Sequence, residues 1–188
     1  TSGRTTLGGE GLQHQDGTSH LVAATIPNCK AYDPAYAGEM AVIIDAGMRE
    51  MVTEQRDVFY YVTLMNENYA QPDLPEGAAE GVLRGCYVFN SFKRLPDGRE
   101  RPISSKNVTL LGSGAILTEV VKAAELLAAE GIDATVLGVT SWSELARDGV
   151  ACEQRALAGE AEPGVPWLTQ QLAATSGPVI AATDYVRA

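Results

Sequence analysis

The spacing of hydrophobic positions predicts strands that alternate with helices along most of the chain. Short runs of β-branched and aromatic residues are typical of buried strands. Apolar residues that recur every three or four positions are typical of a helix with one buried face. The predicted strands are 28–33, 57–64, 84–92, 107–114 (ending in a glycine turn), 132–141 and 178–184, and the predicted helices are 35–53, 115–130, 143–155 and 166–174.

This alternation determines the fold class that we expect. Helices of about ten or more residues between strands imply right-handed crossovers and a mostly parallel sheet. We therefore predict an α/β protein that holds parts of two three-layer domains. The first would span residues 1–75, residues 76–106 would form a linker and the start of the next domain, and residues 107–188 would form a second, truncated domain.

Three segments lack this periodicity. The opening residues 1–25 are polar and glycine-rich, with one short apolar stretch, and we predict a loop. A native domain rarely begins with so long an irregular segment, so we expect the chain to be a piece of a larger protein. The proline-containing stretch 65–77 predicts another loop, and 93–107 is rich in turn residues, with Asp97-Gly98 fitting the tip of a hairpin.

The predicted helix 35–53 carries one apolar stripe, and such a stripe more often packs in a core than binds a cofactor. We therefore expect its members to be buried, namely Ala37, Met40, Ala41, Ile44, Met48 and Met51.

Composition narrows the class of protein. A formal net charge of −10 and a pI near 4.6 disfavour nucleic-acid binding, because an acidic surface repels phosphates. The three cysteines have no spacing typical of a disulfide framework or a zinc site, so we expect free thiols in a reducing compartment. No apolar run approaches the roughly 18 residues of a membrane helix, and no signal-peptide pattern is present. We expect a cytoplasmic protein that does not bind membranes.

The opening loop holds both histidines of the chain, His14 and His20. Histidine can give or take a proton near neutral pH, and the neighbouring glycines let a backbone approach a ligand closely. From residue types alone, a surface or capping role for His14 is the more common outcome. Glu10 and His14 do not form a metal pair, since the glycines between them disfavour the helix that would align them.

A second candidate is Gly112-Ser113-Gly114, which lies between a predicted strand and a predicted helix. Such a turn could cradle an anion at a helix N-terminus. However, Leu117 stands where a dinucleotide fingerprint has its third glycine, so a tight turn is the favoured interpretation.

Long motifs identify a resemblance. The string GRTTLGGEGLQHQDGTSH resembles the histidine loop of homodimeric pyruvate dehydrogenase, the decarboxylating first component of the bacterial complex, and EGLQHQ is similar to the corresponding transketolase loop. The likeness continues in order through IPNCKAYDPAYAGEMAV, YYVTLMNENYAQPDLPEG, LLGSGAIL, VTSWSELARDG and PVIAATDYVRA. It implies the end of a transketolase-like middle domain and most of the C-terminal domain. It is weakest over residues 87–106.

The resemblance implies a function and a set of site residues. By motif position, His14 corresponds to the active-site histidine of the family, and Glu10, Gln13 and His20 correspond to other positions of the same loop. The implied reaction is oxidative decarboxylation of pyruvate, with acetyl transfer to the lipoyl domain of a dihydrolipoyl acyltransferase. The implied cofactors are thiamin diphosphate and Mg²⁺, whose main binding motifs are absent from this sequence. The resemblance also implies a homodimer of such subunits.

Two alternatives remain open at the level of sequence. A transketolase-type enzyme would move two-carbon ketol units, but the arginine-rich pocket for sugar phosphates is not evident. The other alternative is a non-catalytic structural or dimerisation module. For the isolated chain we expect no activity, because the metal motif and the glutamate that activates the cofactor lie upstream in the family.

Overall fold

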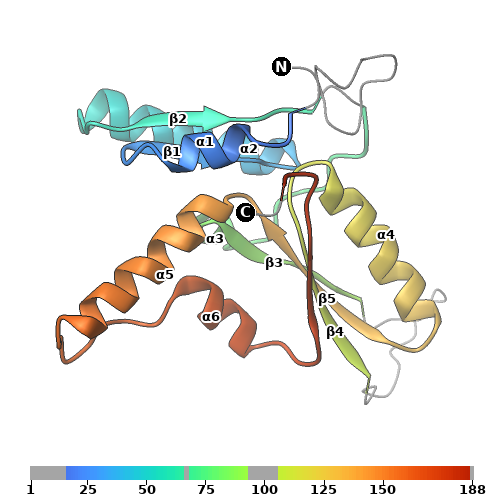
Figure 1. Ribbon diagram of the computed structural model, residues 1–188. Helices are drawn as coiled ribbons and strands as arrows, with labels where there is room; N and C mark the ends of the chain where they lie inside the picture. The colour runs from blue at the N-terminus through green and yellow to red at the C-terminus, as the bar shows by residue number, and fades with distance from the viewer. Residues whose placement is uncertain (1–15, 66–67, 93–105, 187–188) are drawn as a thin grey trace.

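The computed structural model describes residues 16–65, 68–92 and 106–186, in which two sheets are each flanked by helices (Figure 1). The first part of the chain forms a parallel pair of strands. The second part forms a four-stranded sheet. In chain order the elements are α1 (Ser19–Ala24), β1 (Cys29–Tyr32), α2 (Ala37–Met48), the π-helical turn η2 (Arg49–Thr53), β2 (Phe59–Val62), α3 (Ala79–Arg84), β3 (Cys86–Phe92), β4 (Asn107–Gly112), α4 (Ile116–Ala129), β5 (Asp133–Val139), α5 (Trp142–Leu157), α6 (Trp167–Ala173) and β6 (Val179–Ala182).

The first unit, residues 16–65, has three layers around β1 and β2. Because side chains alternate along a strand, Cys29 and Ala31 point to one face of this sheet and Tyr32 points to the other. Ala23 of α1 packs against Cys29 and Ala31. Ile43 of α2 packs with Tyr32 on the opposite face. β1 is thus covered on both faces, as parallel strands usually are, whereas β2 is partly exposed.

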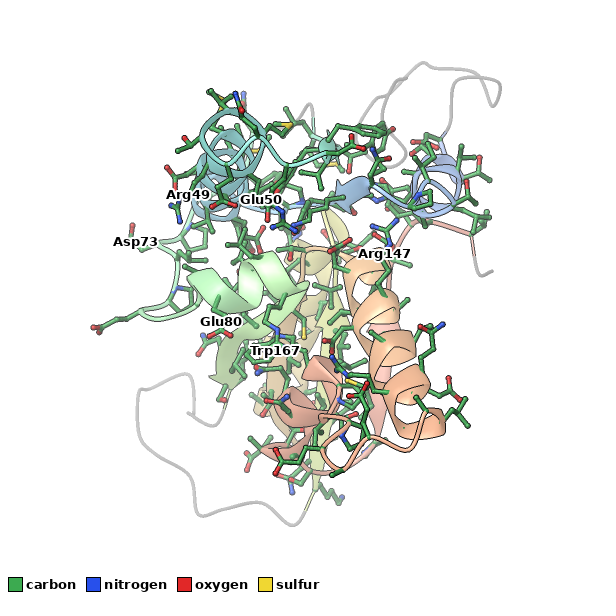
Figure 2. All side chains as sticks on the ribbon, turned by 90° about the vertical axis from the view of Figure 1, so that its left-hand side faces the viewer. Arg49, Glu50, Asp73, Glu80, Arg147 and Trp167 are labelled. Atoms are coloured by element: carbon green, nitrogen blue, oxygen red, sulfur yellow. The ribbon has the colours of Figure 1, made fainter. Side chains whose placement is uncertain are left out.

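The second unit, residues 86–186, is a sheet with strand order β3-β5-β4-β6. β4 is parallel to both β5 and β6, and β3 is antiparallel to β5 at the edge. α4 covers one face, while α5 and α6 cover the other (Figure 1). Figure 2 shows Arg147 at the end of α5 that faces the first unit. The predicted α/β class with mostly parallel strands is therefore confirmed.

Two short helices were not expected from the sequence. α1 forms within the stretch 1–25 that we predicted to be loop, so that prediction is wrong for Ser19–Ala24. α3 forms just before β3 within a segment for which we predicted no helix. Each spans 6 residues, which is too short to establish a helical period, and both depend on contacts with residues far away in the sequence.

The predicted hairpin tip at Asp97-Gly98 stays a prediction. Asp97 and Gly98 lie outside the described residues, but the strands on either side of them, β3 and β4, are not hydrogen-bonded to each other. β5 lies between them and pairs with both. The domain boundaries at 75 and 106 stay a prediction.

The apolar stripe on α2 faces away from the sheet rather than into the core. Ile44 and Met48 are 52% and 55% exposed, and Ala37 and Ala41 are exposed as well. The buried positions of this helix are Glu39, Ile43 and Gly47. The predicted core role is therefore wrong for these exposed members. The helix is apolar on both faces, so periodicity alone did not identify the inner one.

One buried carboxylate joins the two units. Glu39, which is 1% exposed, accepts hydrogen bonds from the backbone N–H groups of Ala35 and Tyr36 and from the hydroxyl of Tyr87 on β3, the last at 2.7 Å. Burial raises the pKa of Glu39, and these three hydrogen bonds only partly oppose that rise. The folded protein therefore binds a proton at Glu39 more tightly than the unfolded chain does.

This predicts a pH dependence of stability. The contribution of Glu39 is fully present below the unfolded pKa, about 4.3, and is lost as the pH rises through the folded pKa. We expect Glu39→Gln, which removes the titration, to gain stability relative to the wild type as the pH rises from about 4 to about 7. Urea unfolding of both proteins across this range measures the difference. A difference that is constant with pH, or that changes with the opposite sign, would contradict the prediction.

Among the described residues, no helix combines the length and the apolar character that crossing a membrane requires.

Candidate functional site

The carboxyl ends of the parallel strands of both sheets meet at Asp33, the residue that follows β1. Its N–H donates to the carbonyl of Thr140, just after β5, at 2.7 Å. Its own carbonyl accepts from the N–H of Gly114, just after β4, at 3.0 Å. Its carboxylate accepts from the hydroxyl of Thr63, just after β2, at 2.6 Å. Asp33 is 1% exposed. Open α/β sheets usually bind ligands outside the carboxyl ends of their strands.

His20 extends this cluster toward the opening segment of the chain. It lies in the first turn of α1, and its Nε2 atom is 2.9 Å from Oγ1 of Thr63. A threonine hydroxyl has one proton to donate, and here Asp33 accepts that proton. The hydroxyl oxygen can therefore act only as an acceptor toward His20. This assigns the proton of the imidazole to Nε2.

Aromatic rings hold the imidazole from two sides. The ring of Tyr185, in the segment after β6, has its centroid 4.5 Å from that of His20, and the ring of Tyr61 lies at 5.5 Å. The hydroxyl of Tyr185 donates to Thr63 at 3.3 Å. His20 is thus fixed both by β2 in the first unit and by the end of the second unit.

The glycine turn after β4 supports the same region. Gly114 has a φ of +52°, and a Cβ atom there would lie 2.5 Å from a carboxylate oxygen of Asp33. The hydroxyl of Ser113 is 3.1 Å from that of Thr183, and Trp142 donates its indole N–H to Ser113 at 3.2 Å. The preferred interpretation of Gly112-Ser113-Gly114 as a tight turn is therefore confirmed. The absence of a side chain at Gly114 allows the close approach to Asp33.

A cavity of about 730 Å³ opens beside His20. α1, α5 and the segment after β6 form its walls, so both units contribute to it. Most of its lining is apolar, while polar or aromatic groups come from His20, Trp142, Ser143, Thr183 and Tyr185. A cavity of this kind suits a small molecule that is oriented by a few polar contacts.

The structure locates only part of the predicted site. Glu10, Gln13 and His14 lie outside the described residues, so their predicted roles stay predictions. His20 is described and lies within the polar cluster. Sequence reasoning did not identify Asp33, Thr63 or Tyr185. Asp33 and Thr63 directly follow strands, and this position was the available signal, but the predicted strands ran through both of them.

Cys29 and Cys86 are not candidate nucleophiles. All three cysteines of the chain are free and buried, as expected. Burial raises the pKa of the Cys86 thiol to about 12. Burial also raises the pKa of Cys29, despite the nearby Arg147. The thiolate is the reactive form, so both side chains are unreactive thiols near neutral pH.

The described residues do not offer a metal site. Within those ranges, no group of three His, Cys, Asp or Glu side chains could hold a metal ion. A thiamin diphosphate site needs clustered oxygen ligands for Mg²⁺. The described residues therefore do not supply a side-chain ligand set for the Mg²⁺ of such a site.

Comparison with known proteins places the chain in a family. Residues 1–72 match the model of the pyruvate dehydrogenase E1 component middle domain, and residues 85–188 match that of the transketolase-like C-terminal domain. The chain belongs to the pyruvate dehydrogenase E1 component family. Curated relatives with that name include the protein of Pseudomonas aeruginosa, 51% identical, and that of Escherichia coli, 48% identical. Each similarity covers 100% of this chain and 20% of the relative.

Solved structures confirm the fold of this family member. A transketolase mutant from Pichia stipitis matches 90% of this chain and 20% of its own with a TM-score of 0.56 at 15% identity. The transketolase of Leishmania mexicana matches 92% of this chain and 21% of its own with a TM-score of 0.54 at 17% identity. At these identities the likeness concerns the fold alone. The chain spans about a fifth of the length of the curated relatives.

Proposed function

We propose that this chain is part of a full-length pyruvate dehydrogenase E1 component that decarboxylates pyruvate oxidatively. The acetyl unit would pass to a lipoyl group on a dihydrolipoyl acyltransferase partner. The observation that carries the proposal is 51% identity to a protein of that name across the whole chain, including the histidine-containing opening segment. We further propose that the full-length subunit works as a homodimer.

His14 is the residue that we propose for catalysis. An imidazole N–H directed at the oxygen that gains charge on the substrate would stabilise the transition state. A second role that we propose for the same side chain is delivery of a proton to the lipoyl sulfur. Glu10 and Gln13 belong to the same segment and are proposed as active-site loop residues.

His20 has a different proposed role. Its Nε2 proton is directed at Thr63, and its ring is packed by Tyr61 and Tyr185. A ring held on several sides in this way is suited to anchoring the opening segment rather than to exchanging protons with a substrate. This supports a division of labour in which His20 holds the segment and His14 acts on the substrate.

The cofactor would be held by other parts of the full-length protein. When bound, thiamin diphosphate with Mg²⁺ supplies the electron sink for decarboxylation. Because the described residues supply no ligand set for the Mg²⁺, we assign none of them to the cofactor. We therefore propose that the isolated chain is inactive and that its second unit is a structural module.

The decisive experiment uses the full-length protein with thiamin diphosphate, Mg²⁺, pyruvate and a lipoyl domain. We expect release of CO₂ and an acetylated lipoyl domain. Ketol transfer between sugar phosphates, without acetylation, would favour a transketolase-type activity and reject the proposal. Calorimetric titration of the isolated chain with the cofactor and Mg²⁺ should give no tight, Mg²⁺-dependent binding. Tight binding would show that the chain holds more of the site than proposed.

A further inference from the structure

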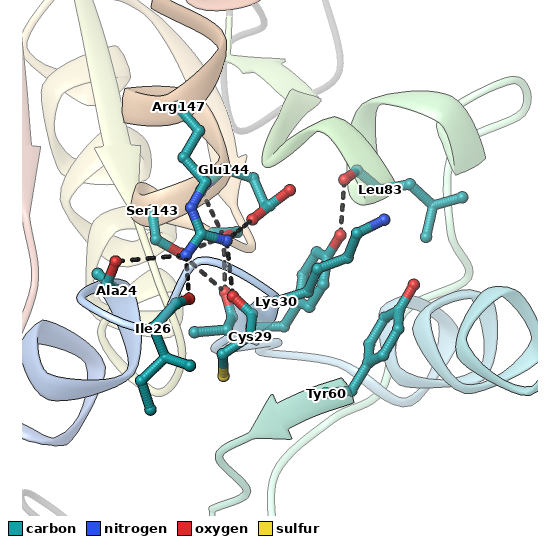
Figure 3. Close-up of polar contacts among 12 residues, drawn as sticks. Ala24, Ile26, Cys29, Lys30, Tyr60, Leu83, Ser143, Glu144 and Arg147 are labelled. Atoms are coloured by element: carbon teal, nitrogen blue, oxygen red, sulfur yellow. Dashed lines mark hydrogen bonds and ion pairs between the residues drawn. The ribbon is translucent and has the colours of Figure 1, made fainter. Parts of the chain in front are cut away.

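Arg147 of α5 contacts the backbone of the first unit at three successive places (Figure 3). Its guanidinium group donates to the carbonyl of Cys29 at 2.6 Å, to that of Ile26 at 2.8 Å and to that of Ala24 at 3.3 Å. Glu144, one turn earlier on α5, accepts from the same group at 2.8 Å. The guanidinium thus joins the second unit to the connection between α1 and β1.

These carbonyls need a partner that the local backbone does not supply in full. Ala24 is the last residue of α1, and the final carbonyls of a helix lack donor partners within it. Arginine presents five N–H donors in a planar fork, so one side chain can reach several carbonyls at once. A lysine ammonium on a flexible stem cannot reproduce this arrangement.

Apolar packing holds α1 only weakly. Leu21 and Val22 are 46% and 60% exposed, and Ala23 is its one buried residue. Burial of a single methyl group stabilises little, since hydrophobic stabilisation scales with the apolar area removed from water. Polar contacts therefore set the position of α1. His20 contacts Thr63 at the start of the helix. Arg147 donates to the carbonyl of Ala24 at the end of the helix and to that of Ile26 just beyond it.

We propose that Arg147 is a positioning residue that fixes α1 and, through it, the preceding segment that carries His14. This inference rests on the function proposed above. The nearby Ser141 supports it, because its hydroxyl donates to the carbonyl of Ala31 at 2.6 Å and so fixes the start of α5 against β1. The second unit thereby fixes α1, although none of its residues is proposed to be catalytic.

The test compares Arg147→Ala with Arg155→Ala in the full-length enzyme. Arg155 is a matched control, since it lies on the same helix and also donates to a carbonyl, that of Pro163 within the second unit. We expect Arg147→Ala to lower kcat for pyruvate decarboxylation by roughly ten- to hundredfold, because a small misplacement of catalytic groups is costly. KM for pyruvate should change much less. Arg155→Ala should have the kcat and KM of the wild type.

Two further measurements separate positioning from a general loss of structure. Added guanidinium ions should restore part of the kcat of Arg147→Ala, whereas sodium chloride at the same concentration should not. Hydrogen exchange of the amides of residues 20–26 should accelerate in Arg147→Ala and not in Arg155→Ala. If Arg147→Ala does not fold, Arg147→Lys is judged by the same kinetic and exchange criteria.

The inference is overturned if the wild type decarboxylates pyruvate and the Arg147 variant does so equally well. It is also overturned if both arginine variants lose activity alike, or if the exchange of residues 20–26 does not change. A wild-type enzyme without pyruvate decarboxylation would instead reject the proposed function. In that case the exchange measurement still decides whether Arg147 fixes α1.

Discussion

Replacing His14 by alanine in the full-length enzyme is expected to lower the rate of pyruvate decarboxylation by roughly 10²–10³-fold. A preorganised N–H donor contributes most where charge develops in the transition state, and alanine leaves that oxygen without a partner. If the contact forms only in the transition state, kcat and kcat/KM should fall by the same factor. Steady-state and single-turnover measurements with pyruvate give both values.

His20→Gln is the comparison for this variant. A glutamine amide can still donate to Oγ1 of Thr63, the contact that His20 makes through Nε2. We therefore expect His20→Gln to retain much more activity than His14→Ala. The assignment of His14 is wrong if decarboxylation and acetyl transfer both stay near wild type when it is replaced. Equal losses in the two variants would argue against the division of labour between the histidines.

Hydrophobic periodicity predicted the elements that are long or deeply buried. The strand predicted within 107–114, ending in a glycine turn, spans Asn107–Gly112, and the helix predicted at 115–130 spans Ile116–Ala129. Both lie at the centre of the second unit, where local propensity and burial favour the same structure. The same reasoning did not predict α1, because Arg147 and His20 hold that helix through residues distant in the sequence.

The inner face of α2 shows a second limit of sequence reasoning. Ile43 and Ile44 are adjacent and equally apolar, yet Ile43 is fully buried whereas Ile44 is half exposed. The helical period identifies a stripe but does not say which layer it meets when apolar residues occur on both faces. The packing of Ile43 with Tyr32 and Val82 decides the orientation, and that contact exists only in the folded chain.

Less of the candidate site than of the secondary structure could be predicted from the sequence, because the site forms only when distant elements meet in the fold. Residue types and motif likeness identified the histidine segment. The partners of His20 were not identifiable, because Thr63 and Tyr185 come from distant elements that meet only when the two sheets bring their strand ends together. Asp33 lies within one of the family-like strings, but that likeness assigned it no role. Its position is defined by backbone contacts with Thr140 and Gly114 in the second unit.

Replacing Gly177 by alanine is expected to destabilise the protein by more than about 3 kcal/mol. Gly177 has a φ of +84°, and a Cβ atom there would lie 1.9 Å from the carbonyl oxygen of Asn107. That oxygen belongs to the first residue of β4, so a side-chain rotation cannot relieve the overlap. The chain entering β6 would have to move away from β4, to which β6 pairs from Thr109 to Gly112.

Gly149→Ala is the matched control, because the same methyl group there meets no atom within 4 Å and Gly149 lies inside α5. We expect it to stabilise the protein by about 0.5–1 kcal/mol, since glycine in a helix costs more backbone entropy than alanine. Urea unfolding of the two variants should therefore give shifts of opposite sign. Shifts of the same sign and similar size would mean that backbone geometry at Gly177 does not control the pairing of β6. Shifts of opposite sign in the free energy of unfolding would indicate that the backbone conformation of Gly177 controls the docking of β6. That docking places Tyr185 beside His20.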